Sequence, residues 1–292
     1  MSSGGWASGF VKANGIAIHW TRTGEPTGKR PPTGGHAPGG GRRPALVLCH
    51  GFSDDGLCWR PIATALEPDY DVVMLDARGH GLSDAPEGGY EPIAMGEDIV
   101  AAAQALGLEA PVAIGHSMGA IAALVAAGVH PEAFRAIVLE DPPCGWFERQ
   151  AGEIELADRI ERLRAEIDTR RRRDRSELVE ECRTEFPHWP DSELGPWAEA
   201  KIRLRPAAAS AVDAQERMSV DWPKIISAVA RPVLVIAGEP ALGSALSPQG
   251  ERLLAEWVPQ ARIERIHGAG HSVRREAPGA YLRLVRAFVS RV

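Results

Sequence analysis

Short, nearly continuous apolar runs alternate with longer segments along most of this 292-residue chain. Runs such as Ala45–Cys49 contain no polar break, as expected for strands that are covered on both faces. The segments between the runs, for example Met95–Leu106, have the length and apolar content of helices. Strands that alternate with helices predict a parallel sheet with right-handed crossovers, and hence an α/β fold. The strand runs are Ala45–Cys49, Val72–Leu75, Val112–Ile114, Ala136–Leu139, Val233–Ile236 and Ile263–Ile266.

The first strands are expected to form an antiparallel hairpin ahead of the parallel sheet. Phe10–Ala13 and Ile16–Trp20 flank Asn14-Gly15, which is a favoured type I′ turn. Residues 23–43 are then crowded with Gly, Pro and Thr and carry few apolar side chains. Such a segment predicts a surface insertion, to which the sequence assigns no role.

Residues 145–222 interrupt the alternation. Leu156, Ile160, Leu163 and Ile167 recur at helical spacing, which predicts helices in this block. We interpret it as a helical cap inserted between the sixth and seventh strands. The chain then divides into a core domain over 1–144, a cap over 145–222, and the rest of the core over 223–292. The arginine cluster at 170–173 is interpreted as a solvated helix face, because acidic residues surround it.

Composition and charge narrow the class of protein. The apolar content of 44% and charged content of 25% are those of a soluble globular domain, and a net charge of −6 argues against nucleic acid as a partner. The sequence has no signal peptide pattern, and its apolar stretches are too short to span a membrane. Four cysteines without C-x-x-C spacing predict reduced thiols and a cytoplasmic location. No phosphate loop or spaced metal-ligand pattern occurs, so no cofactor or metal is expected.

The pentapeptide Gly115-His116-Ser117-Met118-Gly119 lies between an apolar run and a helical segment. Strand, tight turn and helix with serine at the apex is the context in which G-x-S-x-G indicates a nucleophile. The flanking glycines are expected because the backbone passes too close for a Cβ, and the turn itself is strained. We therefore predict that Ser117 is a nucleophile.

A serine hydroxyl is hardly ionised at neutral pH, so it needs a base within hydrogen-bond reach. His271, in Gly268-Ala269-Gly270-His271, follows the last predicted strand and is the candidate base. His116 is expected to support the turn instead. Acyl transfer also needs backbone N–H donors for the developing oxyanion. The candidates are Met118, directly after the nucleophile, and Phe52, in the loop after the first parallel strand.

These segments together resemble the α/β-hydrolase superfamily, and specifically its cap-bearing esterase, lactonase and dehalogenase-like branch. The matching motifs are His50-Gly51-Phe52, Asp76–Ser83, the Ser117 turn and Gly268–His271, in that order. The resemblance covers residue 44 to the C-terminus. It implies a mostly parallel eight-stranded sheet with a helical cap after the sixth strand.

The acidic partner of the histidine is where the chain departs from the commonest pattern of that family. Many relatives place an aspartate three residues after the glycine that ends the seventh strand, whereas Gly238-Glu239-Pro240-Ala241 has alanine there. Other relatives place the acid at the end of the sixth strand, which corresponds here to Glu140. A carboxylate at that point can fix the histidine tautomer and stabilise the imidazolium. Glu140 is the preferred acid, with Asp141 and Glu239 as alternatives.

The predicted function is a serine hydrolase that cleaves a carboxylic ester or lactone of a small molecule through an acyl-enzyme. A serine nucleophile argues against dehalogenation and epoxide hydrolysis, because the family's intermediate in those reactions is an ester of an aspartate. Hydrolysis of a C–C or amide bond on the same residues, or a ligand-sensing protein with slow turnover, remain alternatives. The sequence does not indicate the oligomeric state. Aromatic residues in or beside the cap are candidates for the substrate pocket, namely Trp146, Phe147, Trp189, Trp197 and Trp222.

Overall fold

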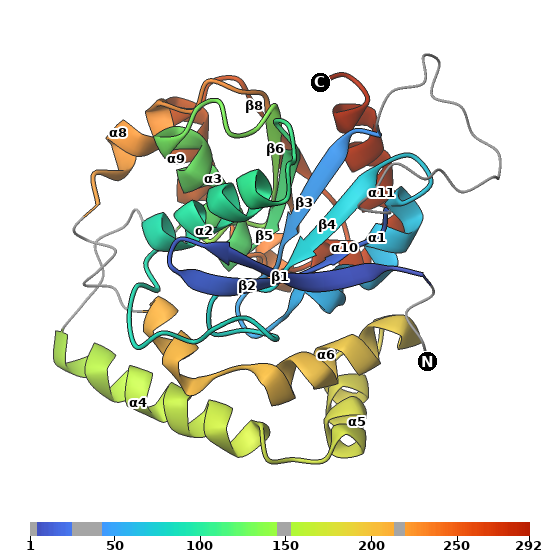
Figure 1. Ribbon diagram of the computed structural model, residues 1–292, viewed down its shortest axis with the longest axis vertical. Helices are drawn as coiled ribbons and strands as arrows, with labels where there is room; N and C mark the ends of the chain where they lie inside the picture. Colours follow the sequence, from blue (N-terminus) through green and yellow to red (C-terminus); the bar gives the residue numbers. More distant parts are fainter. Residues whose placement is uncertain (1–4, 25–42, 145–152, 213–219) are drawn as a thin grey trace.

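A computed structural model describes residues 5–24, 43–144, 153–212 and 220–292. Its centre is an eight-stranded sheet with the order β1-β2-β4-β3-β5-β6-β7-β8 (Figure 1). Strands β1 and β2 form an antiparallel hairpin, β2 pairs antiparallel with β4, and all other pairs are parallel. This is the predicted mostly parallel sheet. The strands are β1 Ala7–Ala13, β2 Ile16–Arg22, β3 Ala45–Cys49, β4 Asp71–Leu75, β5 Val112–His116, β6 Ala136–Glu140, β7 Val233–Ala237 and β8 Ala261–Arg265.

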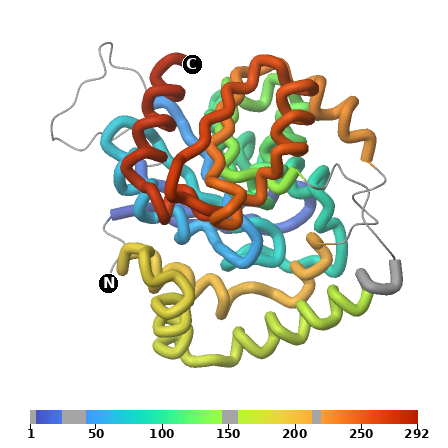
Figure 2. Tube along the Cα trace, turned by 180° about the vertical axis from the view of Figure 1, so that it is seen from behind, coloured from blue at the N-terminus to red at the C-terminus, as the bar shows by residue number. Residues whose placement is uncertain are grey.

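Helices cover both faces of the sheet, as Figures 1 and 2 show from opposite sides. On one face lie α1 and α11, and on the other lie α2, α3, α8 and α9. The central strands are buried on both faces, which explains why they are apolar throughout. These helices are α1 Arg60–Leu66, α2 Pro92–Ala105, α3 Met118–Val129, α8 Trp222–Ser227, α9 Pro248–Trp257 and α11 Pro278–Val289.

Alternation along each strand decides which face a side chain serves. Val138 packs with the α1/α11 side of the core, and Leu139 packs with the α2/α3 side. The same alternation sends the side chain of the next residue, Glu140, back to the α1/α11 side. The end of β6 therefore presents successive residues to different surroundings.

The helices of residues 153–212, between β6 and β7, form a separate layer at the carboxyl end of the parallel strands (Figures 1 and 2). Helices α5 and α6 have a small apolar core of their own, which includes Leu178, Leu194 and Trp197. This is the helical cap expected after the sixth strand. The cap elements are α4 Glu153–Arg170, α5 Arg175–Glu185, α6 Asp191–Arg203 and the 3₁₀ helix η3 Pro206–Val212, and the other short elements are η1 Gly56–Trp59, η4 Pro240–Leu242 and α10 Val273–Glu276.

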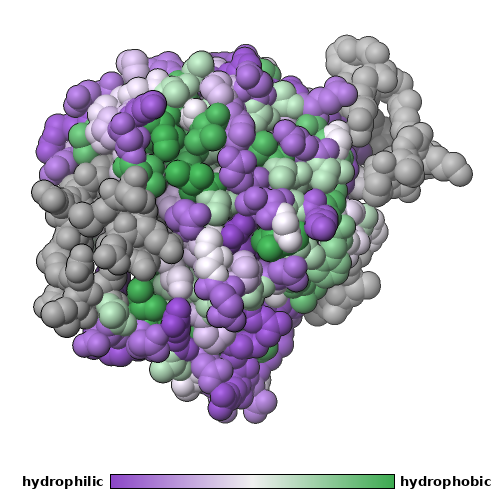
Figure 3. All heavy atoms as spheres, turned by 60° about the vertical axis from the view of Figure 1, so that its left-hand side comes forward, coloured by the Kyte–Doolittle hydropathy of each residue, from purple (hydrophilic) through white to green (hydrophobic). Residues whose placement is uncertain are grey.

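The outer surface of the cap is strongly charged, and the lower part of the molecule in Figure 3 is mainly hydrophilic. Most arginines at the end of α4 and in the following turn form ion pairs with neighbouring acids, whereas Arg171 donates a hydrogen bond to the backbone oxygen of Ile202 at 3.4 Å. Arg170 binds Glu181 at 3.1 Å, and Arg172 binds Asp168 at 2.5 Å. We call these the cap surface pairs. They agree with the interpretation of this cluster as a solvated helix face.

No described helix is long and apolar enough to cross a membrane. The predicted insertion at 23–43 lies almost entirely outside the described residues.

Candidate active site

Ser117 stands on the sharp turn between β5 and α3. Its φ is +51° and its ψ is −114°, a combination of backbone angles that residues other than glycine rarely adopt. A Cβ on Gly115 would lie 2.3 Å from the backbone oxygen of Gly119, and one on Gly119 would lie 2.3 Å from that of Cys49. Both glycines are therefore required by close backbone contact. The strained turn that the pentapeptide predicts is present.

His271 lies beside this serine, although the two residues are far apart in sequence. The Ser117 Oγ atom is 3.0 Å from His271 Nε2. The histidine loop is held by Glu276, whose carboxylate accepts hydrogen bonds from Gly270 N–H at 2.5 Å and Ser272 N–H at 3.1 Å. His116 donates a hydrogen bond from Nε2 to the backbone oxygen of His271 at 3.0 Å. The serine, its neighbour and the histidine loop are thus joined directly.

The carboxylate that binds His271 belongs to Asp141. His271 Nδ1 lies 2.6 Å from Asp141 Oδ2, which places the proton on Nδ1 and leaves the Nε2 lone pair for the serine hydroxyl. Two further donors hold this fully buried carboxylate, Ser244 Oγ at 2.5 Å and Ala245 N–H at 2.6 Å. Serine, neutral imidazole and carboxylate in this order can activate the serine and stabilise an imidazolium.

The expectation that Glu140 orients the histidine is corrected by this geometry. Glu140 accepts hydrogen bonds from Arg274, through the backbone N–H at 2.8 Å and the guanidinium at 3.3 Å. The strand alternation described above turns its side chain to the α1/α11 side. Asp141 follows the strand with a φ of +43°, and this turn brings its carboxylate to His271. Glu239, the other alternative, binds His267 and the Gly268 N–H and so supports the histidine loop from outside.

The segment His50–Asp55, which we call the β3 loop, passes next to the serine. A Cβ built on Gly51 would lie 3.3 Å from the Ser117 Cβ and 2.6 Å from His116 Nδ1. Within the described part of the chain, the backbone N–H groups of Phe52 and Met118 have no hydrogen-bond partner. Free N–H groups beside a nucleophilic serine are what an oxyanion site requires.

A buried charge cluster lies beneath the β3 loop. Asp54 binds Arg274 at 2.9 Å and Arg275 at 3.0 Å, and Arg275 binds Glu193 of the cap helix α6 at 3.0 Å. Burial alone would raise the pKa of Asp54, but Arg275, Lys201 and Arg274 outweigh it and hold that pKa below its ordinary value. Sequence reasoning missed this cluster, although the pair Arg274-Arg275 directly after the histidine motif offers a partner for a buried acid. Its members are Asp54, Glu140, Glu193, Arg274 and Arg275.

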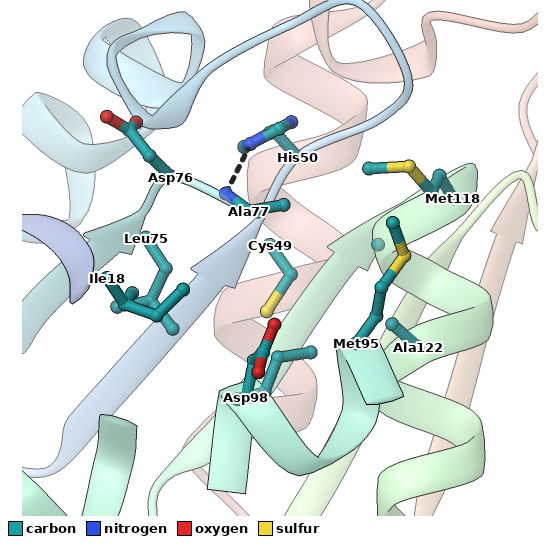
Figure 4. Close-up of a pocket in the computed structure, with 12 residues that line it drawn as sticks. Ile18, Cys49, His50, Leu75, Asp76, Ala77, Met95, Asp98, Met118 and Ala122 are labelled. Atoms are coloured by element: carbon teal, nitrogen blue, oxygen red, sulfur yellow. Dashed lines mark hydrogen bonds between the residues drawn. The ribbon is translucent and has the colours of Figure 1, made fainter. Parts of the chain in front are cut away.

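Two small cavities adjoin the site. One lies behind the serine turn, where Cys49, Met95 and Met118 converge and His50 accepts a hydrogen bond from the Ala77 N–H (Figure 4). Its remaining walls are mostly apolar core side chains, together with the buried Asp76 and Asp98, and we interpret it as a gap in the packing. The other lies between the cap and the β3 loop, and its lining consists of Phe52, Ser53, Leu163, Glu166, Ile167, Arg170, Lys201 and Leu204.

The predicted aromatic pocket residues that the structure describes lie elsewhere. Trp189 stacks on Phe186 at 4.0 Å inside the cap and also lies under the Arg275 guanidinium. Trp222 is buried in the core at the start of α8, and Trp197 belongs to the apolar core of the cap. None of these tryptophans lines either cavity. Trp146 and Phe147 lie outside the described residues.

Comparison with known proteins agrees with the fold. Residues 44–276 match the family described as the alpha/beta hydrolase fold, which is most of the chain. The chain belongs to the α/β-hydrolase family. This hydrolase is similar along most of its length to N-formylmaleamate deformylase from Pseudomonas putida, at 30% identity over 91% of this chain and 90% of the relative. It is 27% identical to 2-(acetamidomethylene)succinate hydrolase from Mesorhizobium japonicum, over 84% of this chain and 88% of the relative.

A solved structure extends the comparison to three dimensions. The crystal structure of the deformylase from Pseudomonas putida S16 superposes with a TM-score of 0.74 and 24% identity, covering 96% of this hydrolase and 100% of that chain. At that identity the likeness concerns the fold. It includes the cap as well as the core, because nearly all of both chains is matched.

Proposed function

We propose that this hydrolase cleaves an acyl bond of a small molecule through an acyl-enzyme on Ser117. The observation that carries the proposal is the chain of hydrogen bonds from Ser117 Oγ through His271 to Asp141. In the first step the serine oxygen attacks the substrate carbonyl while His271 Nε2 takes the hydroxyl proton. The histidine then gives this proton to the leaving group, and the acyl group stays on the serine. A water molecule, deprotonated by the same histidine, releases the acid and restores the serine.

The tetrahedral intermediates of both steps carry a negative oxygen. The free N–H groups of Phe52 and Met118 lie on the two segments that flank the serine, and we assign them to this oxyanion. Preorganised donors of this kind typically contribute about 10²–10³-fold each to the rate. The substrate enters, in this proposal, beneath a cap formed by residues 145–222. The cavity between the β3 loop and helices α4 and α6 then receives one of its groups.

The bond that is cleaved is the finer part of the proposal. The two relatives that match most of the chain are named after substrates that contain an acylated nitrogen and at least one carboxylate. They favour a small carboxylate-bearing N-acyl compound over the ester or lactone expected from the sequence alone. Esters and lactones remain the second candidate, because the same residues cleave them and an alkoxide leaves more readily than an amide nitrogen. Hydrolysis of an ester or lactone therefore remains the alternative hypothesis.

Labelling and turnover test the proposal together. A fluorophosphonate should label Ser117, and Ser117→Ala should abolish both the label and the hydrolysis of p-nitrophenyl acetate. A panel of N-formyl and N-acetyl amides, simple esters and lactones, with and without a carboxylate, then ranks substrates by kcat/KM. The highest value is expected for an anionic N-acyl compound. Labelling of Ser117 without turnover of any panel member would favour a ligand-sensing role instead.

A further inference from the structure

The β3 loop carries a strained residue directly after Phe52. Ser53 has a φ of +65°, in the left-handed region that residues with a Cβ avoid. A strained backbone persists only where surrounding groups fix it. The Phe52 N–H belongs to the Gly51–Phe52 peptide, and a hydrogen bond from the Asp54 N–H to the Gly51 oxygen at 3.2 Å closes this peptide into one turn with Ser53. Contacts that hold Ser53 therefore also limit the direction of the Phe52 N–H.

A lysine of the cap supplies that hold. Lys201, on helix α6, donates hydrogen bonds from Nζ to the Ser53 backbone oxygen at 2.9 Å and to Ser53 Oγ at 2.7 Å. The lysine is only 5% exposed, and its ammonium lies 4.5 Å from the centre of the Trp197 ring. Burial lowers its pKa, and the nearby Asp54 carboxylate opposes that shift. A buried cation is held in place here by a ring, a neighbouring charge and two acceptors.

The next two residues of the loop are held in the same manner. Asp54 lies between the guanidinium groups of Arg274 and Arg275. Asp55 binds Arg203, which is also on α6, at 2.8 Å. Three consecutive loop residues are thus fixed by cations, and two of those cations come from the cap.

We propose that Lys201 is a positioning residue that holds the Phe52 N–H at the oxyanion site, so that helix α6 of the cap sets part of the geometry for acyl transfer in the core. This inference rests on the proposed serine mechanism. Lys201 acts through Ser53 and does not itself touch the reacting atoms. The cap then serves the chemical step as well as covering the substrate.

The test compares Lys201→Met with the wild type and with Lys224→Met, an exposed lysine of α8 that serves as a matched control. The substrates are p-nitrophenyl acetate and the anionic p-nitrophenyl hydrogen succinate. We expect kcat of Lys201→Met to fall about 10–100-fold on both esters with little change in KM, because a misplaced donor weakens transition-state binding alone. The pH dependence of kcat should keep its shape, since Ser117, His271 and Asp141 are untouched.

Other outcomes separate the competing explanations. A rise in KM confined to the anionic ester would make Lys201 a binding residue for substrate carboxylate and overturn the positioning role. Wild-type kcat in a folded Lys201→Met variant would overturn it as well. A wild-type protein that neither turns over esters nor reacts with a fluorophosphonate would overturn the proposed function itself, and this inference with it. Circular dichroism and thermal unfolding check that each variant is folded.

A second variant keeps the proposal testable if Lys201→Met does not fold. Ser53→Ala retains the lysine and the backbone acceptor but removes the Oγ acceptor at 2.7 Å. Its kcat is expected to fall on both esters by less than that of Lys201→Met, again at nearly constant KM. An unchanged kcat in a folded Ser53→Ala protein would contradict the proposal.

Discussion

The cap surface pairs and the buried charge cluster are built from the same residue types but differ in their exposure to water. The Arg172 side chain is 77% exposed, whereas that of Arg274 is fully buried. An exposed pair is screened and loses side-chain entropy, so it contributes little to the free energy of unfolding. Buried charges interact strongly, but only while every partner is present. We therefore expect substitutions in the cap surface pairs to be tolerated, and substitutions in the buried charge cluster to disturb the segments that it connects.

The buried cluster connects segments that must meet at the site. Arg274 binds Glu140 at the end of β6 and Asp54 in the β3 loop, and it lies three residues after His271. Its guanidinium also packs over the Trp59 ring at 4.4 Å. The cluster therefore lies directly under the segments that carry the serine's proposed partners. Of the cap surface pairs, Arg170 lines the cavity beside the β3 loop, whereas the exposed pair Arg172–Asp168 has no such connection.

The largest effect on kcat is expected from one of two adjacent buried carboxylates, Glu140 and Asp141. Asp141→Asn should lower kcat by about 10³–10⁴-fold, because an amide in place of the carboxylate favours the wrong histidine tautomer and does not stabilise the imidazolium. Glu140→Gln should reduce kcat far less, and its main effect should be on stability through Arg274. Ester turnover and thermal unfolding of both variants give the comparison.

The reverse result would restore the original assignment. If Glu140→Gln were folded but inactive while Asp141→Asn retained activity, Glu140 would be the acid. Ser244→Ala is a useful companion, because it removes one hydrogen bond to Asp141 and leaves the carboxylate in place.

The same pair of residues marks the limit of what the sequence predicts. Apolar runs and turn residues are local signals, and they predict the sheet, the hairpin and the cap. Ser117 and His271 stand in motifs whose place at the sheet edge follows from the fold. The choice between Glu140 and Asp141 depends on two features that no local pattern predicts. One is the positive φ at Asp141, and the other is Arg274, which is distant in sequence and binds Glu140. Strand alternation alone would have favoured turning Glu140 away from the histidine.

The roles of the cap residues cannot be predicted from the sequence for a related reason. Lys201 reaches Ser53 only because α6 packs against η1 and the β3 loop, and no local pattern encodes that contact. Large apolar side chains in a cap predict pocket residues, and on that ground the sequence favours the tryptophans of the cap. Trp189 and Trp197 are instead the packing surfaces for buried cations.

The next largest effect should follow when a buried cation is removed. Arg274→Met leaves Asp54 and Glu140 without one of their partners, and the free energy of unfolding should fall by about 3–5 kcal/mol. Methionine retains much of the apolar contact with Trp59, so the loss reports mainly on charge. Urea unfolding at neutral pH measures it, with the exposed Arg283→Met as the matched control.

This comparison also has a contrary outcome. A loss below about 1 kcal/mol would mean that the buried cluster behaves like a surface pair. The contrast between the two regions would then be wrong.

A smaller effect concerns the buried His80, which stays neutral because burial lowers its pKa. His80 lies against His50 and Phe52, and burial lowers its pKa from 6.5 to about 3. Between these pH values the unfolded chain binds a proton here and the folded chain does not. Stability therefore falls as the pH falls through this range, by about 1.4 kcal/mol per unit from this residue.

His80→Asn should remove that contribution and make the stability less dependent on pH between 6.5 and 4.5. Urea unfolding at several pH values measures the slope of the free energy of unfolding against pH. A loss of packing energy alone would lower the free energy equally at every pH and leave this slope unchanged. His188→Asn, at an exposed position on the cap, should leave the slope at its wild-type value. An unchanged slope in His80→Asn would show that this histidine is protonated in the folded protein.

The smallest expected effect lies in the cap surface pairs. Arg172→Ala removes the i,i+4 ion pair with Asp168, and the free energy of unfolding should change by only about 0.3–0.5 kcal/mol. Added salt should reduce even this difference, because screening weakens exposed charges first. Ester turnover should stay at the wild-type level, since Arg172 contacts neither the β3 loop nor the cavity beside it. Urea unfolding in low and high salt, run beside Arg274→Met, gives the measurement. A loss comparable to that of Arg274→Met would show that the cap surface pairs act as a cooperative network, and exposure would no longer explain the difference between the two regions.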